Sequence, residues 1–425
     1  MKRAVDKMEK KLTVKQNMLW NSIGSFAYLI CQWLITIVVV RLSNYENAGI
    51  LSLAISVNNI FYTISTFGLR HYQVSDINNQ YTDKEYIVAR MLSCLLGMVC
   101  CCVFLGLNSK HYNAMQTTCV LVYFMFKSVE AFIDVFQGIQ QKKYRMDYVG
   151  RSYVVRGILT LVGFSATLKF TNNVAVGVIV MAVSSLIVAV FYDYKICKSL
   201  MPVKDSLRLN KIWDLLKNNV SLMINAVFMT GFVSVSRYFL ELYEGEKMLG
   251  IYASIATPTV IIQTACGMIY SPLVSEYAKF YVNKDKKKFV GLIKSVSMVF
   301  TLIFAVCVVG IFLVGDFFLK LLFGPAILEY SYLLLQTIVV TFLVSIVYWL
   351  SAILVVERKQ NMVMLVNGLG IIINVIMSMI IIPVYKINGI NYALLIALSF
   401  DIILLIMIVY ATTKKYFEVK KGKIC

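Results

Sequence analysis

Residues 361–382 read NMVMLVNGLGIIINVIMSMIII, a run of 22 residues without a charged side chain. About 20 apolar residues in a helix cross the hydrocarbon core of a bilayer, which is about 30 Å thick. Strands of a membrane barrel need about 10 residues of alternating polarity, so a continuous apolar run excludes them. This segment therefore predicts one membrane-spanning helix.

Similar runs recur in both directions, from Met18 to Ala411. The expected spans are 18–40, 48–69, 87–107, 115–138, 150–168, 174–194, 219–240, 249–272, 291–314, 330–356, 361–382 and 388–411. The composition agrees, because 59% of the residues are hydrophobic and 15% are charged, whereas a soluble domain has about 25% charged residues. The sequence predicts an all-α integral membrane protein with about twelve transmembrane helices.

The net charge of +19 could indicate a nucleic-acid partner. Most of the 41 Lys and Arg, however, fall in the two tails and in alternate loops, all on one side of the membrane. This is the positive-inside pattern, and it predicts that both termini are cytoplasmic. The basic clusters at 284–288 and 414–423 are expected to contact anionic membrane lipids, so nucleic acid is not expected as a partner. The ten Cys include no Cys-x-x-Cys pair, so neither a metal site nor a cofactor is expected.

The chain divides into two halves of six spans. We expect an N-terminal lobe at 1–197, a cytoplasmic linker at 198–217 and a C-terminal lobe at 218–425. Short matches support a duplication: residues 48–50 (AGI) match 249–251 (LGI), and 74–76 (VSD) match 274–276 (VSE). Two lobes with the same orientation would be related by a pseudo-two-fold axis along the membrane normal, the arrangement that allows rocking around a central site.

The fourth span contains the clearest polar pattern inside the membrane. Lys127, Glu130, Asp134, Gln137 and Gln141 follow one another at spacings of three and four, so they share one helical face. One interpretation is an internal salt bridge between Lys127 and Glu130. The other is a hydrated path for a substrate or an ion, because an ion pair alone does not require the amides to continue the same face.

Further polar side chains inside spans are expected to line this cavity. They are Asn21, Tyr28, Gln32, Asn59, Gln137, Asn225 and Asn374. Arg156 and Arg237 are candidate diphosphate contacts, because the planar guanidinium matches phosphate oxygens, although both could instead extend to the membrane interface. Arg41 is the expected pseudo-symmetric counterpart of Arg237, since each ends the first span of its lobe. Asp401 is expected to be a structural or peripheral polar residue.

Four segments carry a resemblance to a known family. Residues 17–24 (NMLWNSIG), 32–36 (QWLIT), 47–51 (NAGIL) and 68–76 (GLRHYQVSD) resemble the Wzx-type polysaccharide flippases. These belong to the superfamily that also includes multidrug antiporters and lipid II flippases. The resemblance covers essentially the whole chain.

The resemblance implies that the chain moves an undecaprenyl-diphosphate-linked oligosaccharide from the inner to the outer leaflet of the bacterial cytoplasmic membrane by alternating access. This would serve capsule, O-antigen or exopolysaccharide synthesis, with glycosyltransferases and a polymerase as candidate partners. Arg70 lies in a matched motif and is a candidate diphosphate contact, together with Lys127. Glu130 and Asp134 would repel a diphosphate, so they are candidate sites for coupling to H⁺ or Na⁺.

Two alternatives remain. A cation-coupled multidrug antiporter of the same superfamily would use the same lobes and a carboxylate-rich cavity. A membrane enzyme, such as a polysaccharide polymerase or an acyltransferase, is disfavoured because the chain has only two His, His71 and His111, and no large external loop. The sequence predicts a transporter and not an enzyme, and it does not identify the glycan.

Overall fold

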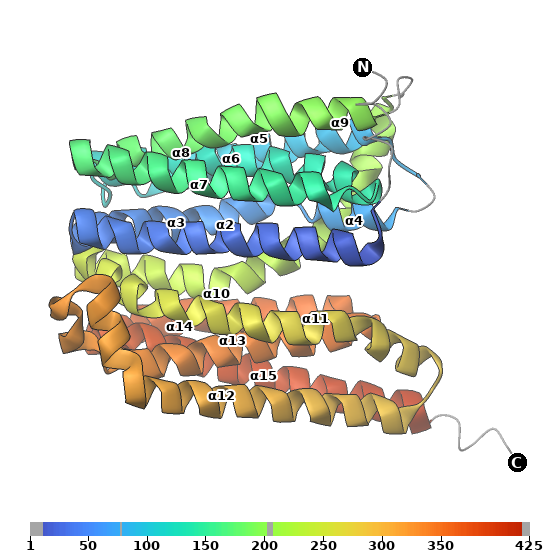
Figure 1. Ribbon diagram of the computed structural model, residues 1–425. Coiled ribbons are helices and arrows are strands. Elements are labelled where there is room, and N and C mark those ends of the chain that lie inside the picture. Colours follow the sequence, from blue (N-terminus) through green and yellow to red (C-terminus); the bar gives the residue numbers. More distant parts are fainter. Residues whose placement is uncertain (1–11, 77–78, 202–206, 419–425) are drawn as a thin grey trace, which may run out of the picture. The chain divides into compact units, whose positions relative to one another are not determined.

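The computed structural model describes residues 12–76, 79–201 and 207–418, and nearly all of them are helical (Figure 1). The first unit contains α2 (Val14–Leu42), α3 (Tyr45–Thr66), α4 (Leu69–Ser75), α5 (Asp83–Leu107), α6 (Ala114–Lys142), α7 (Met146–Thr171), α8 (Val174–Val188), the π-helical η1 (Ala189–Tyr194), α9 (Lys195–Leu200) and the start of α10 (Leu209–Ala256). The second contains the rest of α10, η2 (Thr257–Thr259), α11 (Val260–Val282), α12 (Lys286–Phe323), η3 (Pro325–Tyr330), α13 (Leu333–Val356), α14 (Gln360–Tyr385) and α15 (Ile387–Glu418). The tail before residue 12, Pro202 and the basic residues after 418 lie outside the described residues.

The helices confirm an all-α multi-pass membrane protein. Among the described residues, 10 helical stretches are long and apolar enough to cross a membrane. Two of the expected spans are not counted separately. The polar residues of α6 lower its hydropathy, and the seventh and eighth spans form the continuous stretch Leu209–Val282. Gly245, with φ 80° and ψ 173°, interrupts that stretch and separates the two spans.

Several helices begin at side chains that cap their free backbone N–H groups. The side chains of Thr13, Thr82 and Asn113 each accept a hydrogen bond from the backbone N–H of the residue three positions on. The Gln or Glu side chain at that position accepts one in turn from the backbone N–H of the capping residue. Such capping boxes satisfy two donors that a helix otherwise leaves unpaired. They fix the starts of α2, α5 and α6.

Helices α2 and α7 pack closely because glycines leave room for their backbones. A Cβ atom on Gly150 would lie 2.5 Å from the carbonyl oxygen of Trp20, and Gly24 packs directly against Gly150. Farther along, a Cβ atom on Gly157 would lie 3.2 Å from the Cys31 sulfur. In a membrane, helices associate through such close packing rather than through the hydrophobic effect.

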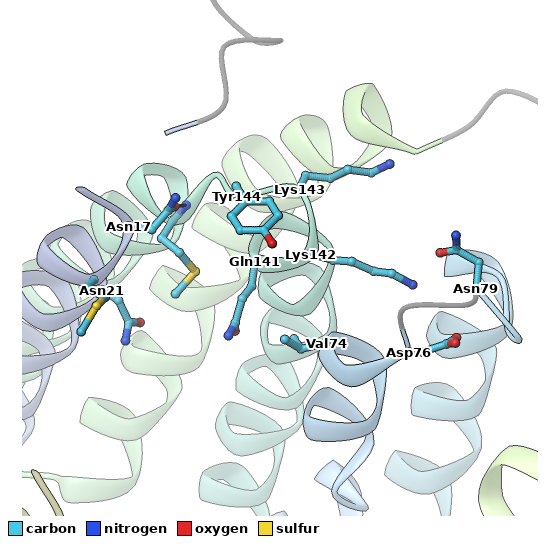
Figure 2. Close-up of a pocket in the computed structure, with 11 residues that line it drawn as sticks. Asn17, Asn21, Val74, Asp76, Asn79, Gln141, Lys142, Lys143 and Tyr144 are labelled. Atoms are coloured by element: carbon cyan, nitrogen blue, oxygen red, sulfur yellow. Dashed lines mark hydrogen bonds between the residues drawn. The ribbon is translucent and has the colours of Figure 1, made fainter. Parts of the chain in front are cut away.

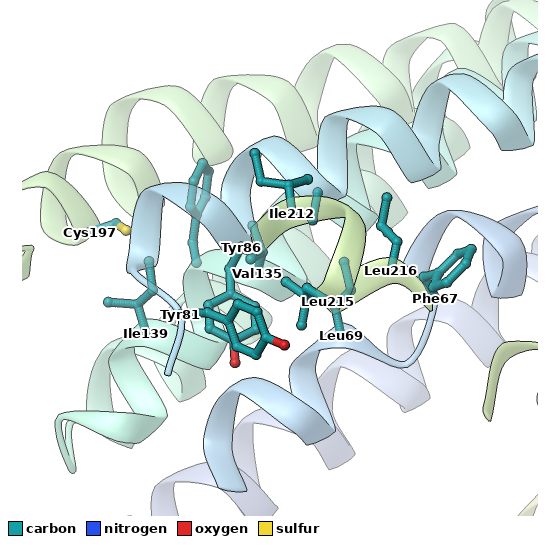
Figure 3. Close-up of a cluster of buried hydrophobic side chains, with 12 residues drawn as sticks. Phe67, Leu69, Tyr81, Tyr86, Val135, Ile139, Cys197, Ile212, Leu215 and Leu216 are labelled. Carbon is teal, nitrogen blue, oxygen red and sulfur yellow. The ribbon is translucent and has the colours of Figure 1, made fainter. Parts of the chain in front are cut away.

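The start of α10 packs onto the first unit. Figure 3 shows Ile212, Leu215 and Leu216 directed into a cluster with side chains from α4, α5 and α6. Just before the helix, Arg208 Nε lies 2.9 Å from Glu85 Oε1. The division between the units, at Val227 and Phe228, therefore falls inside α10 and beyond the expected linker at 198–217.

Candidate functional site

The polar face of α6 borders a cavity inside the first unit. Its volume is about 300 Å³. The lining residues are Ser25, Tyr28, Leu29, Tyr62, Lys127, Glu130, Asp134, Gln137, Tyr153 and Arg156. They come from α2, α3, α6 and α7, so four helices of one unit enclose this inner cavity.

Glu130 lies between two cations. Its Oε2 atom is 2.9 Å from Lys127 Nζ, and its Oε1 atom is 3.0 Å from Arg156 Nη1. The Tyr28 hydroxyl also donates a hydrogen bond to Oε1. Glu130 and Arg156 are both buried. The expected Lys127–Glu130 pair is present, but it is one part of a larger network.

Asp134, one turn farther along α6, also lies between two cations. Arg70 Nη1 is 3.2 Å from one carboxylate oxygen, and Arg90 Nη2 is 2.7 Å from the other. Arg70 also donates to Gln137 Oε1 at 3.0 Å and to Gln141 Oε1 at 3.1 Å. The guanidinium of Arg70 therefore follows the polar face of α6 over two turns.

The cluster carries excess positive charge. Arg70, Arg90, Lys127 and Arg156 are four cations. Glu130 and Asp134 supply two negative charges, and Asp193, which interacts with Arg156, can supply a third. Buried charges in a membrane are stable when they are paired, and Glu130 and Asp134 each have two cationic partners. At least one positive charge of the cluster is therefore not balanced by a carboxylate. The repulsion of a diphosphate by Glu130 and Asp134, and their role as coupling groups, stay predictions.

Aromatic rings hold the cations of the inner cavity. Lys127 Nζ lies 5.2 Å from the centroid of the Tyr62 ring, and Arg156 Cζ lies 5.0 Å from that of Tyr28 and 5.2 Å from that of Tyr153. Cation–π contacts of this kind stabilise a charge where water is scarce. The three tyrosines also give the cavity flat apolar walls that carry hydroxyl groups.

A second cavity, of about 640 Å³, lies where α6 ends and α7 begins (Figure 2). Its lining is Asn17, Met18, Asn21, Val74, Asp76, Asn79, Gln141, Lys142, Lys143, Tyr144 and Met146. Figure 2 shows Lys142 extending toward the segment that carries Asp76 and Asn79. Gln141 lines this outer cavity and also bonds to Arg70, which bonds to Asp134 and Gln137 of the inner cavity. The polar face of α6 therefore connects the two cavities.

The structure brings together most of the candidates predicted in the first lobe. Tyr28, Lys127, Glu130, Asp134, Gln137 and Arg156 line the inner cavity, Asn21 lines the outer one, and Arg70 joins the two. Gln32 Nε2 donates to the Thr160 hydroxyl at 3.4 Å. Asn59 lines neither cavity.

Other candidates lie elsewhere. Arg41 is exposed in the last turn of α2, and Asn225 lies at the unit boundary in α10. In the second unit, Arg237 interacts with Tyr252. Asn374 bridges α14 to α10 by donating to the Phe232 carbonyl and accepting from Ser236. None of these four residues lines either cavity, and their proposed contacts with a substrate stay predictions.

Sequence reasoning missed Arg90 as a member of the cluster. Arg90 lies near the start of a span, where a positive charge is expected for topology alone. A signal was nevertheless present, because Tyr86, Arg90, Ser93 and Gly97 repeat at spacings of four, three and four and all are buried on one face of α5. The tyrosines Tyr62 and Tyr153 were also missed, since aromatic residues are common in any membrane helix.

Sequence comparisons relate the chain to proteins of polysaccharide biosynthesis. Residues 14–278 match the family model described as polysaccharide biosynthesis protein. The capsular polysaccharide biosynthesis protein CapF of Staphylococcus aureus is 24% identical over 366 residues, which cover 85% of this chain and 90% of CapF.

Solved structures show the same fold. An inward-facing multidrug resistance transporter of the MATE family, from the MOP superfamily, superposes with a TM-score of 0.72 at 13% identity, over 96% of this chain and 99% of that one. The lipid II flippase MurJ in an inward closed conformation gives a TM-score of 0.71 at 13% identity, over 94% and 90%. At these identities the structures establish the fold alone.

Proposed function

Because the chain belongs to the polysaccharide biosynthesis protein family and shares its fold with MOP-superfamily transporters, we propose that it is a transporter of that superfamily and a flippase for a lipid-linked glycan. The substrate is an undecaprenyl-diphosphate-linked oligosaccharide, moved by alternating access from the inner to the outer leaflet of the bacterial cytoplasmic membrane. The product would supply capsule or another surface polysaccharide. Glycosyltransferases and a polymerase are the proposed partners.

The observation that carries this proposal is the excess of positive charge around Glu130 and Asp134, where the four cations outnumber the nearby carboxylates. A diphosphate is anionic, and arginine binds phosphate oxygens through its planar fork of donors. Arg156 and Lys127 border the inner cavity and are the groups that a diphosphate would reach there. Arg70 would meet it on the way from the outer cavity.

The lining of the inner cavity also suits sugars. Tyr28, Tyr62 and Tyr153 offer flat apolar faces with polar hydroxyl groups at their ends. Sugar rings present C–H groups on their faces and hydroxyls at their edges, so they match such walls. The polyprenyl chain needs no polar cavity and would remain in lipid.

The outer cavity is the proposed entrance. Positive-inside topology assigns this end of the unit to the cytoplasm, where the lipid-linked substrate is made. Lys142 and Lys143 at its rim would attract the phosphate groups and the anionic lipids around them. Both termini lie on this side in the proposed topology.

A cation-coupled multidrug antiporter is the alternative within the superfamily. It would need an acidic cavity for cationic drugs, whereas both carboxylates here are already engaged by cations. Coupling of the flippase to H⁺ or Na⁺ is proposed as well, with Glu130 and Asp134 as the candidate groups in the first unit.

The test is flipping of a labelled undecaprenyl-diphosphate oligosaccharide in proteoliposomes. We compare the native chain with Arg156→Ala and with Arg151→Ala, an exposed arginine one turn away on the same helix. Flipping that is lost in Arg156→Ala and kept in Arg151→Ala supports the proposal. Efflux of cationic dyes by the native chain without any lipid flipping would replace it with the antiporter.

A further inference from the structure

Asp401 is completely buried in the second unit. It lies in the middle of α15, in a stretch that is otherwise apolar (SFDIILLIMIVY, residues 399–410). Neither of its carboxylate oxygens has a hydrogen-bond partner. The structure thus places an acidic side chain inside the membrane with nothing to compensate its charge.

The carboxyl group lies beside Gly370 of α14 and Phe232 of α10. Buried Asn367 and Asn374 lie one turn to either side of Gly370, and neither donates a hydrogen bond to Asp401. A Cβ atom on Gly370 of α14 would lie 2.6 Å from Asp401 Oδ1 and 2.7 Å from Cζ of Phe232. The absence of a side chain on Gly370 is therefore what leaves room for the carboxyl group between α14 and α15.

No cation acts on Asp401 from the described helices around it. Within α13 and α14, which pack on α15, the titratable side chains are Tyr348 and Tyr385. On α10, which supplies Phe232, the nearby Arg237 interacts with Tyr252 instead. Among the described residues, no hydrogen bond joins Asp401 to a charged side chain.

The buried carboxylates of the first unit form a direct contrast. Among its described residues, each of them accepts at least one hydrogen bond, and these are Asp76, Glu85, Glu130, Asp147 and Asp193. In Asp76, Glu85, Glu130 and Asp147, donors replace the water that the carboxylate loses. Asp193 is an intermediate case, because Ser152 donates to one of its oxygens and the other has no partner. Asp401 has no such donors.

An isolated ionised carboxylate in an apolar interior is so costly that the group takes up a proton instead. A sodium ion in its place would need several oxygen ligands, and Asp401 belongs to no group of three or more acidic, His or Cys side chains among the described residues. We infer that Asp401 is a proton-binding site of the second unit, protonated in this conformation and able to release the proton when a conformational change admits water. Its use to drive transport rests on the proposed flippase function.

Infrared difference spectroscopy of the full chain in lipid nanodiscs tests the proton site without any substrate. The native chain should show the C=O stretch of a buried protonated carboxyl group, sensitive to exchange into D₂O. The band should disappear in Asp401→Asn and remain in Asp316→Asn, an exposed aspartate of the same unit. Asp401→Glu is a second variant that keeps the test valid if Asp401→Asn misfolds. Its carboxyl band should shift in frequency rather than vanish. A native spectrum without the band, or a band that survives in both Asp401 variants unchanged, would overturn the inference.

The link to transport is measured separately in proteoliposomes with and without an imposed pH gradient. The gradient should stimulate lipid flipping by the native chain and by Asp316→Asn, and Asp401→Asn should lose this stimulation while retaining flipping without a gradient. Loss of all flipping in the native chain would contradict the proposed function but leave the infrared result standing. Equal stimulation of Asp401→Asn and the native chain would remove Asp401 from the coupling step.

Discussion

Arg90 Nη2 lies 2.7 Å from Asp134 Oδ2, and the side chain of Arg90 is completely buried. Arg90 also donates to the carbonyl oxygen of Ser65 at 2.8 Å. Arg70, on the other oxygen of Asp134, keeps 20% of its side chain exposed. One cation thus holds the carboxylate in place, while the other faces the path between the two cavities.

This division of roles predicts opposite phenotypes for the two arginines. Arg90→Met should lower the stability of the protein by about 3–5 kcal/mol, because it breaks a buried ion pair. Arg70→Met should leave thermal unfolding nearly unchanged and reduce lipid flipping about tenfold, since it removes a substrate contact worth about 1.4 kcal/mol. Thermal unfolding in detergent and flipping in proteoliposomes measure the two effects. Equal destabilisation by both substitutions would contradict the assignment.

The sequence predicted the members of this cluster better than their pairing. Spacings of three and four place Lys127, Glu130 and Asp134 on one face wherever α6 lies, so helical periodicity alone identified them. The pairing of Arg156 with Glu130 depends on how α7 packs against α6, and that of Arg70 with Asp134 on how α4 packs against α6. The spacing of residues within one helix does not predict such packing.

The sequence also did not predict what surrounds the polar residues that lie inside spans. Asp401 was expected to be structural or peripheral, because one acidic residue in an apolar span does not show which face of the helix is buried. Gly370 makes its burial possible, and this contact joins two helices. Asn374 was expected to line a cavity because it is a polar residue inside a span. Its amide donates a hydrogen bond to the backbone carbonyl of Phe232 and accepts one from the Ser236 hydroxyl. A polar residue in a span therefore predicts an interior position, but not whether protein or water meets it.

Glu130→Gln should strengthen binding of a diphosphate and slow its release. The substitution leaves Lys127 and Arg156 without a counter-charge, so the excess positive charge of the cluster rises by one. We expect the dissociation constant for the lipid-linked substrate to fall about tenfold, which is about 1.4 kcal/mol, and steady-state flipping to fall as well. Binding is measured by titration of the purified chain, with the exposed Glu46→Gln as the control. Unchanged affinity together with unchanged ion dependence would exclude Glu130 from both substrate binding and coupling.

Two glycines offer a matched test of helix packing. Gly150→Ala places a methyl group 2.5 Å from the Trp20 carbonyl, and such overpacking should cost about 1–3 kcal/mol. Gly106→Ala, in α5, meets no atom within 4 Å and should be neutral or stabilise the helix by about 0.5–1 kcal/mol. Gly150→Ala is thus expected to lower the unfolding temperature, whereas Gly106→Ala should leave it unchanged or raise it. A neutral Gly150→Ala would show that α2 and α7 can separate without loss.

Glu357, in the connection between α13 and α14, should make the second unit more stable in mild acid. Burial raises the pKa of its carboxyl group, although the hydroxyl groups of Thr412 and Thr413 donate to it and oppose this effect. A folded-state pKa above the unfolded value means that the folded chain binds the proton more tightly, and this proton binding stabilises the fold. The stabilisation is complete below the unfolded pKa and is lost as pH rises through the folded pKa. The unfolding temperature of the native chain should therefore decline as pH rises above about 4, and Glu357→Gln should reduce this decline. The exposed Glu329→Gln should retain the whole decline, and a Glu357→Gln chain with the native pH profile would assign the dependence to another group.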